Sequence, residues 1–119
     1  MKYALLVYHD QSDWERYSEE EAARRRAESM PKWISLFAEM DKADPTAFGK
    51  ELEGAREAKV LRVRDGQRVV TDGPFAETKE QIGGLFVTDL PDLDEAIRIA
   101  SLVPAAEYGS LEIRPIVVQ

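Results

Sequence analysis

Cysteine is absent from this 119-residue sequence, and histidine occurs only once. The lack of cysteine excludes disulfides, zinc–thiolate sites and a cysteine nucleophile, and it is typical of a cytoplasmic protein. Basic residues are in deficit as well, because 16 Lys and Arg stand against 23 Asp and Glu, which gives a net charge of −7. We therefore expect neither nucleic acid nor an anionic membrane as a partner, since phosphate contacts need clustered cations.

Long apolar runs are also missing. No stretch approaches the roughly 18 apolar residues of a membrane-spanning helix. The apolar residues 3–8 have the length of a strand, with no small-residue cleavage site after them, so no signal peptide is expected. One histidine with scattered carboxylates matches no metal spacing, and we expect no metal or other cofactor. The hydrophobic share, 44%, suits one folded domain over residues 1–119.

The hydrophobic pattern predicts four core strands, two helices and a hairpin. Strands are expected at residues 2–8, around Phe48 and Leu52, at 85–89 and at 110–118. The hairpin joins residues 59–64 to 67–71 through Asp65-Gly66, a strong turn signal because both turn residues need positive φ. The order β-α-β-hairpin-β-α-β predicts an α+β, ferredoxin-like split βαβ fold.

Each predicted helix begins at a recognisable cap. Ser18 and Glu21 form a capping box for the first helix, and Asp92 caps the second. Pro31 lies inside the first helical pattern, so it either kinks the helix or starts a second segment. The expected buried stripe of the first helix consists of Ala23, Ala27, Met30, Ile34 and Phe37, widened by Trp33, Leu36 and Met40. The expected buried stripe of the second helix consists of Leu93, Ala96, Ile97, Ala100 and Val103.

The most distinctive local sequence is Asp72-Gly73-Pro74-Phe75. Its first interpretation is a turn, because Asp binds nearby backbone amides, Gly accepts positive φ and Pro fixes φ. The alternative is a carboxylate that faces a ligand, supported by Lys79 and Glu80 on the loop that follows.

Three further side chains are candidates for a site. His9 follows the first strand, and a histidine can exchange a proton near neutral pH. A satisfied polar residue is the alternative there. Tyr8 lies near the same strand end, within reach of a pocket or of the core. Arg114 alternates with Glu112 on one strand face, where the two form either a cleft ion pair or a structural pair.

The segment from Val70 to Gly84 resembles the DGPF branch of the YCII-related family, as do the opening residues 1–8 and the closing residues 111–116. The resemblance covers nearly the whole chain. It implies a ferredoxin-like fold that dimerises into an α/β barrel with a cleft. Some relatives carry a His–Asp pair associated with acid/base chemistry, and one degrades a chlorinated aromatic. The first helix here lacks the histidine that such relatives place there, and only His9 is present.

Two functions follow as hypotheses. The first is a small-molecule pocket, with acid/base chemistry on a small polar or aromatic compound. Its catalytic residues would be Asp72 and His9, and its binding residues Tyr8, Gly73, Pro74, Lys79, Glu80 and Arg114. The second is a non-catalytic dimeric binding or regulatory module. A homodimer is expected in both cases, because the first strand is apolar on both faces and two helices cover only one.

Overall fold

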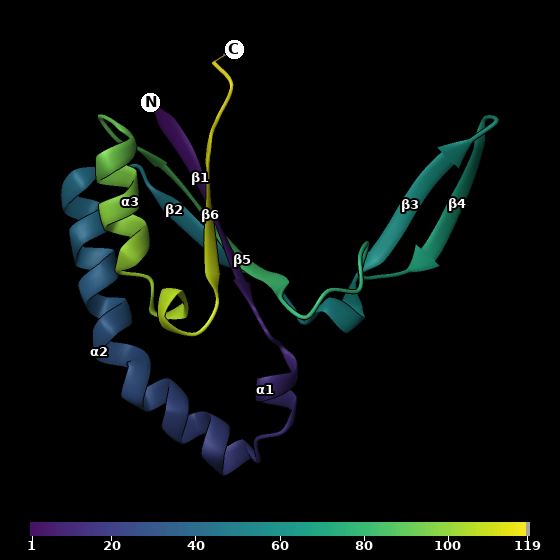
Figure 1. Cartoon of the computed structure of the whole chain (residues 1–119), viewed down its shortest axis with the longest axis horizontal. Helices are drawn as coiled ribbons and strands as arrows, with labels where there is room; N and C mark the ends of the chain where they lie inside the picture. Colours follow the sequence, from purple (N-terminus) through teal and green to yellow (C-terminus); the bar gives the residue numbers. More distant parts are fainter. Residues whose placement is uncertain (119) are drawn as a thin grey trace.

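The computed structural model describes residues 1–118, and its centre is a four-stranded antiparallel sheet. The strands are β1 (Lys2–His9), β2 (Phe48–Glu51), β5 (Gln81–Asp89) and β6 (Ser110–Pro115), in the order β2-β5-β1-β6. Helices α2 (Glu19–Ala43) and α3 (Leu93–Ser101) lie on one side of this sheet, and the hairpin β3–β4 stands away from it (Figure 1). The predicted α+β class is confirmed.

The alternation along β1 explains which face of the sheet is covered. Tyr3, Leu5 and Val7 are buried toward the helices, whereas Ala4 and Leu6 on the opposite face stay half-buried. Successive side chains of a strand point to opposite faces, so β1 places one set of residues against the helices and the other set on the open face of the sheet. The core against the helices also contains Leu36, Met40, Phe86, Leu90, Ala96, Ile99, Ala100, Val103 and Ala105.

Helix α2 is a single helix, although Pro31 lies inside it. The predicted cap is confirmed, because the Ser18 hydroxyl accepts a hydrogen bond from the Glu21 amide at 3.1 Å. The helix ends at Asp44, which is its C-cap. No second segment begins at Pro31, and the N-terminal half of the helix runs away from the sheet (Figure 1).

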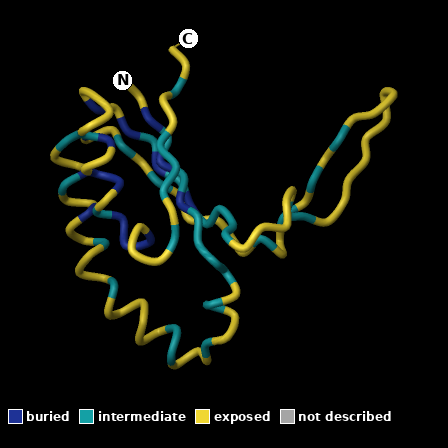
Figure 2. Tube along the Cα trace, viewed as in Figure 1, coloured by how far each residue is buried: buried dark blue, intermediate teal, exposed yellow. Residues whose placement is uncertain are grey.

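The predicted buried stripe of α2 is confirmed only at Leu36 and Met40. Met30, Ile34 and Phe37 are 51%, 59% and 52% exposed, while Leu36 and Met40 are buried. Figure 2 shows mostly exposed residues along the N-terminal half of the helix, because only its C-terminal half packs on the sheet. Asp92 caps α3 as predicted. Ala96 and Ala100 are buried, also as predicted, but Leu93 and Ile97 are half exposed. Ile99 is buried in their place on the side of α3 that faces the sheet.

The predicted hairpin is confirmed. Strand β3 (Lys59–Arg64) pairs with β4 (Gln67–Asp72), and the turn residues Asp65 and Gly66 have φ of 52° and 75°. Its two strands form a sheet of their own, with Leu61, Val63 and Val70 exposed on one face.

Three short helical segments were not predicted: α1 (Ser12–Glu15), η1 (Ala55–Glu57) and η2 (Pro104–Glu107). Strand β5 also begins at Gln81, four residues before the predicted start, and β6 ends at Pro115. Within residues 1–118, no helix has the length and apolar character needed to cross a membrane.

Asp44 joins the end of α2 to the sheet. Its carboxylate, only 7% exposed, accepts hydrogen bonds from the Thr46 amide at 3.0 Å and the Asp89 amide at 2.7 Å. The hydroxyls of Thr46 and Thr88 donate to it as well, at 2.6 and 3.3 Å. These bonds hold the pKa of Asp44 below its usual value, and the bond from the Asp89 amide has the largest effect.

Candidate functional site

A cavity of about 940 Å³ lies among α1, α2, β2, the segment through η1, and the adjoining end of β5. Its lining includes His9 and both tryptophans of the chain, Trp14 and Trp33. Its other aromatic residues are Phe37, Phe48, Phe86 and Tyr108. Concave sites with mainly apolar and aromatic walls and a few polar groups are typical of small-molecule binding.

His9 occupies the last position of β1, beside a bulge in β5. The register slips between Val7, which pairs with Gly84, and Tyr8, which pairs with Ile82, so Gly83 is left unpaired. A Cβ on Gly83 would lie 2.5 Å from Nε2 of His9, so only glycine leaves room for the imidazole there. A bulge next to a functional side chain commonly re-aims that side chain.

The two nitrogens of His9 have different surroundings. Nε2 faces Gly83, while Nδ1 is buried and has no hydrogen-bond partner in the described part of the chain. The Tyr108 ring meets the imidazole edge-on, with the ring centres 6.3 Å apart. A buried nitrogen without a partner is uncommon in folded proteins and requires an explanation, of which a catalytic role is one.

Gln11 connects three segments around the cavity, although the sequence analysis did not select it. Its side-chain amide donates to the Ile82 carbonyl at 3.3 Å, and its side-chain oxygen accepts from the Ala55 amide at 2.7 Å. The residue thus ties the end of β1 to the β5 bulge and to η1. A glutamine in a polar loop carries no sequence signal for such a role, because its partners lie 44 and 71 residues away.

Charged residues at the cavity are exposed, and acidic ones are in the majority. The carboxylates are Glu15, Asp41, Glu51, Glu53 and Glu57, and the cations are Arg26, Lys50 and Arg56. Within residues 1–118, none of these eight side chains forms an ion pair. The Arg26 guanidinium instead lies 5.4 Å from the centre of the Trp14 ring.

Asp72, the predicted catalytic carboxylate, lies elsewhere. It ends β4, its side chain is 85% exposed, and it forms an ion pair with Lys59 across the hairpin. The hydrogen bond from Lys59 lowers the pKa of Asp72. Gly73 donates to the Ala58 carbonyl at 2.8 Å, and Pro74 follows it. These residues close the base of the hairpin, and none of Asp72, Gly73 and Pro74 lines the cavity.

The predicted binding residues near β6 gather on the open face of the sheet, away from the helices. The Tyr8 hydroxyl donates to Glu112 at 3.2 Å, and Arg114 donates to the same carboxylate at 3.0 Å. Burial, followed by the hydrogen bond to Glu112, raises the pKa of Tyr8. Glu80 joins this region by accepting from the Ser110 hydroxyl at 2.7 Å.

Lys79 is exposed near Asp10. The pKa of Asp10 is lowered chiefly by the Ser12 hydroxyl and further by the charge of Lys79. The structure therefore brings Tyr8 and Arg114 together through Glu112, but it places His9 alone among the predicted residues at the cavity.

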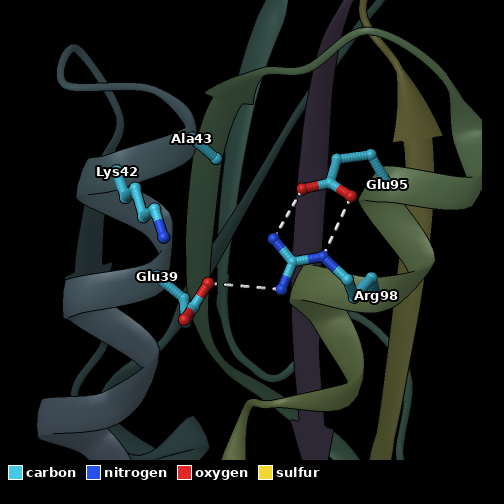
Figure 3. Close-up of a pocket in the computed structure, with 5 residues that line it drawn as sticks. All are labelled: Glu39, Lys42, Ala43, Glu95 and Arg98. Carbon is cyan, nitrogen blue, oxygen red and sulfur yellow. Dashed lines mark hydrogen bonds and ion pairs between the residues drawn. The ribbon is translucent and has the colours of Figure 1, made fainter.

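A second, shallower cleft of about 430 Å³ lies between α2 and α3 (Figure 3). Arg98 donates to Glu95 at 2.6 and 2.9 Å and to Glu39 at 3.3 Å, which raises its pKa. The Arg98 guanidinium binds the carboxylates of both Glu95 and Glu39. The cleft therefore contains an ion-pair network that links α2 to α3. Among residues 1–118, no group of three or more His, Asp or Glu side chains is placed to hold a metal ion.

The fold and the cavity define a small α+β domain with an open cavity lined by aromatic side chains. The model of the YCII-related domain matches residues 1–118, and the chain belongs to that family. An uncharacterised protein of Rhizobium meliloti (strain 1021) is 37% identical over 118 residues, which cover 98% of this chain and 92% of that protein.

Proposed function

We propose that this chain is a small-molecule-binding domain whose ligand, a small polar or aromatic compound, occupies the cavity beside His9. The observation that supports this most is the cavity of about 940 Å³ that contains the only histidine and both tryptophans. Aromatic walls supply most of the contact area for such a ligand, and a few polar groups set its orientation.

His9 is also the group that we propose for proton transfer. It lines the cavity wall, where a bound compound would lie next to it. Asp72 is less suited to this role, because its lowered pKa makes it a weaker base and Lys59 already binds its carboxylate. Among the predicted catalytic residues, His9 therefore has the support of the geometry.

The test compares His9→Asn with Asp72→Asn. Asp72→Asn replaces the carboxylate by an amide of the same size, and His9→Asn replaces the imidazole by a smaller amide that does not titrate. A panel of small aromatic amines, phenols and carboxylic acids is screened by thermal shift, and each binder is then followed for conversion by mass spectrometry. We expect His9→Asn to abolish conversion or weaken binding at least tenfold, and Asp72→Asn to behave as wild type. The reverse result would transfer the site to the hairpin.

The second candidate function is a non-catalytic dimeric module, and the open face of the sheet favours it. Ala4 and Leu6 of β1 lie opposite Val87 and Leu85 of β5, and Phe48 of β2 continues this apolar surface. The strand order β2-β5-β1-β6 is the one expected of a ferredoxin-like split βαβ fold. We propose that two copies join through this face into a dimeric α/β barrel, because large apolar patches are rarely left exposed.

A further inference from the structure

We propose that the cavity beside His9 selects an organic cation, a primary or secondary ammonium group on an aromatic body, in preference to an anion. This inference rests on the proposed function, because it names the class of ligand for the same cavity. Two observations support it: the excess of carboxylates at the cavity, and the contact between the Arg26 guanidinium and the Trp14 ring.

The first argument is the charge balance. Five exposed carboxylates at the cavity face three cations, and none of them is neutralised by an ion pair within residues 1–118. The two sets come from the same walls, so the excess of negative charge is local to the cavity. The whole chain adds to it with a net charge of −7. A cavity lined by one sign of charge concentrates ligands of the opposite sign and repels others.

The second argument is the contact between Arg26 and Trp14. The guanidinium lies 5.4 Å from the ring centre, within the range of a cation–π interaction, and both residues line the cavity. Both side chains belong to this protein, so the contact shows that the face of Trp14 accepts a cation. An ammonium ligand would compete with Arg26 for that face, while its aromatic body would lie against Trp33 or Phe37.

Arg26 has consequences for an anion as well. It is one of three cations that line the cavity within residues 1–118, and it lies over the Trp14 ring and forms no ion pair there, so an anion would have to draw it away from the ring. The remaining cations, Lys50 and Arg56, are exposed. Exposed charges are strongly screened by salt, so the preference for a cation should be largest at low ionic strength.

The experiment uses three probes of one shape: phenethylammonium, 2-phenylethanol and phenylacetate. Binding to the full chain is followed through the two indole N–H signals in ¹H–¹⁵N NMR spectra, because the chain has two tryptophans and both line the cavity. We expect phenethylammonium to bind at least about threefold more tightly than 2-phenylethanol and about tenfold more tightly than phenylacetate at low salt.

Two variants should shift this preference in opposite directions. Arg26→Met frees the face of Trp14 and removes a competing charge, so it should tighten phenethylammonium binding by about two- to fivefold. Asp41→Asn with Glu51→Gln removes two carboxylates of the cavity, one from α2 and one from β2, and should weaken it by about threefold. The matched control is Glu20→Gln with Asp94→Asn, which makes the same charge change at exposed positions outside the cavity lining.

The outcomes separate the two proposals. If phenylacetate or 2-phenylethanol shifts the indole signals at least as strongly as phenethylammonium, the cavity remains a binding site and the preference for cations is overturned. An equal loss of binding in the control variant also overturns it, because the effect would then come from the total charge. If no probe shifts either indole signal, this inference fails together with the proposed binding function for compounds of this size.

Discussion

Replacing Asp44 by alanine should destabilise the protein by about 3 kcal/mol. The carboxylate is 7% exposed and accepts four hydrogen bonds at the junction of α2 and β5. Alanine would leave the buried Thr88 hydroxyl and the Asp89 amide without the acceptor that they have in the wild type. Each such group costs about 1–3 kcal/mol.

Asp44→Asn should cost less, about 1–2 kcal/mol, because the amide keeps one oxygen acceptor. Its NH₂ group, however, must face either the Thr46 pair of donors or the pair from Thr88 and Asp89. A hydroxyl can turn to accept a hydrogen bond, but a backbone amide cannot, so one repulsive contact remains. Urea unfolding followed by circular dichroism measures both variants, and Asp94→Asn, which alters an exposed carboxylate, is the control.

The pH dependence gives this prediction a second test. The folded-state pKa of Asp44 is lowered, so its stabilising effect is fully present above the unfolded-state value of about 3.9 and is lost as the pH falls through the folded-state pKa. The stability difference between wild type and Asp44→Asn should therefore shrink as the pH falls below about 4. A difference that stays constant from pH 7 to pH 3, or an Asp44→Ala variant as stable as wild type, would refute the reasoning.

Three further predictions concern the hairpin, the cavity and the dimer. Gly66→Val should lower stability by about 1–3 kcal/mol, because Gly66 has φ of 75° and a β-branched residue resists it; an unchanged thermal midpoint would contradict this. Gln11→Ala should weaken binding at the His9 cavity and increase amide exchange at Ala55, whereas Gln81→Ala should leave that exchange unchanged. Light scattering should give a dimer at micromolar concentration, and Leu6→Glu on the open face should give a monomer; a monomeric wild type would rule out the barrel.

The parts of the fold that depend on local sequence were predictable. Asp65-Gly66 specifies its turn through the φ values that only certain residues accept, and Ser18 and Asp92 cap their helices with their own side chains. The packing of α2 was not predictable in the same way. Periodicity identifies an apolar row, but it does not say which half of a 25-residue helix rests on the sheet. Phe37, which the pattern assigned to the core, therefore lines the cavity instead.

The site was predictable only where a residue was distinctive by itself. His9 stood out because it is the only histidine, and the structure places it at the cavity. The motif at Asp72 was equally distinctive, yet its carboxylate forms an ion pair with Lys59 at the base of the hairpin, and Gly73 does not have the positive φ that the turn interpretation allowed for. The cavity walls come from segments separated by up to about 100 residues, so no local pattern could assemble them.

The measurement that tests the central claim most directly is the location of a bound ligand on the labelled protein. The first compound found to bind is titrated while NMR follows the His9 imidazole, the Trp14 and Trp33 indoles and, on the open face, the Tyr8 ring. The account predicts that the His9 and tryptophan signals shift together with one dissociation constant while Tyr8 is unaffected. Saturable shifts at Tyr8, or at Asp72 on the hairpin, with His9 and both tryptophans unchanged would contradict it.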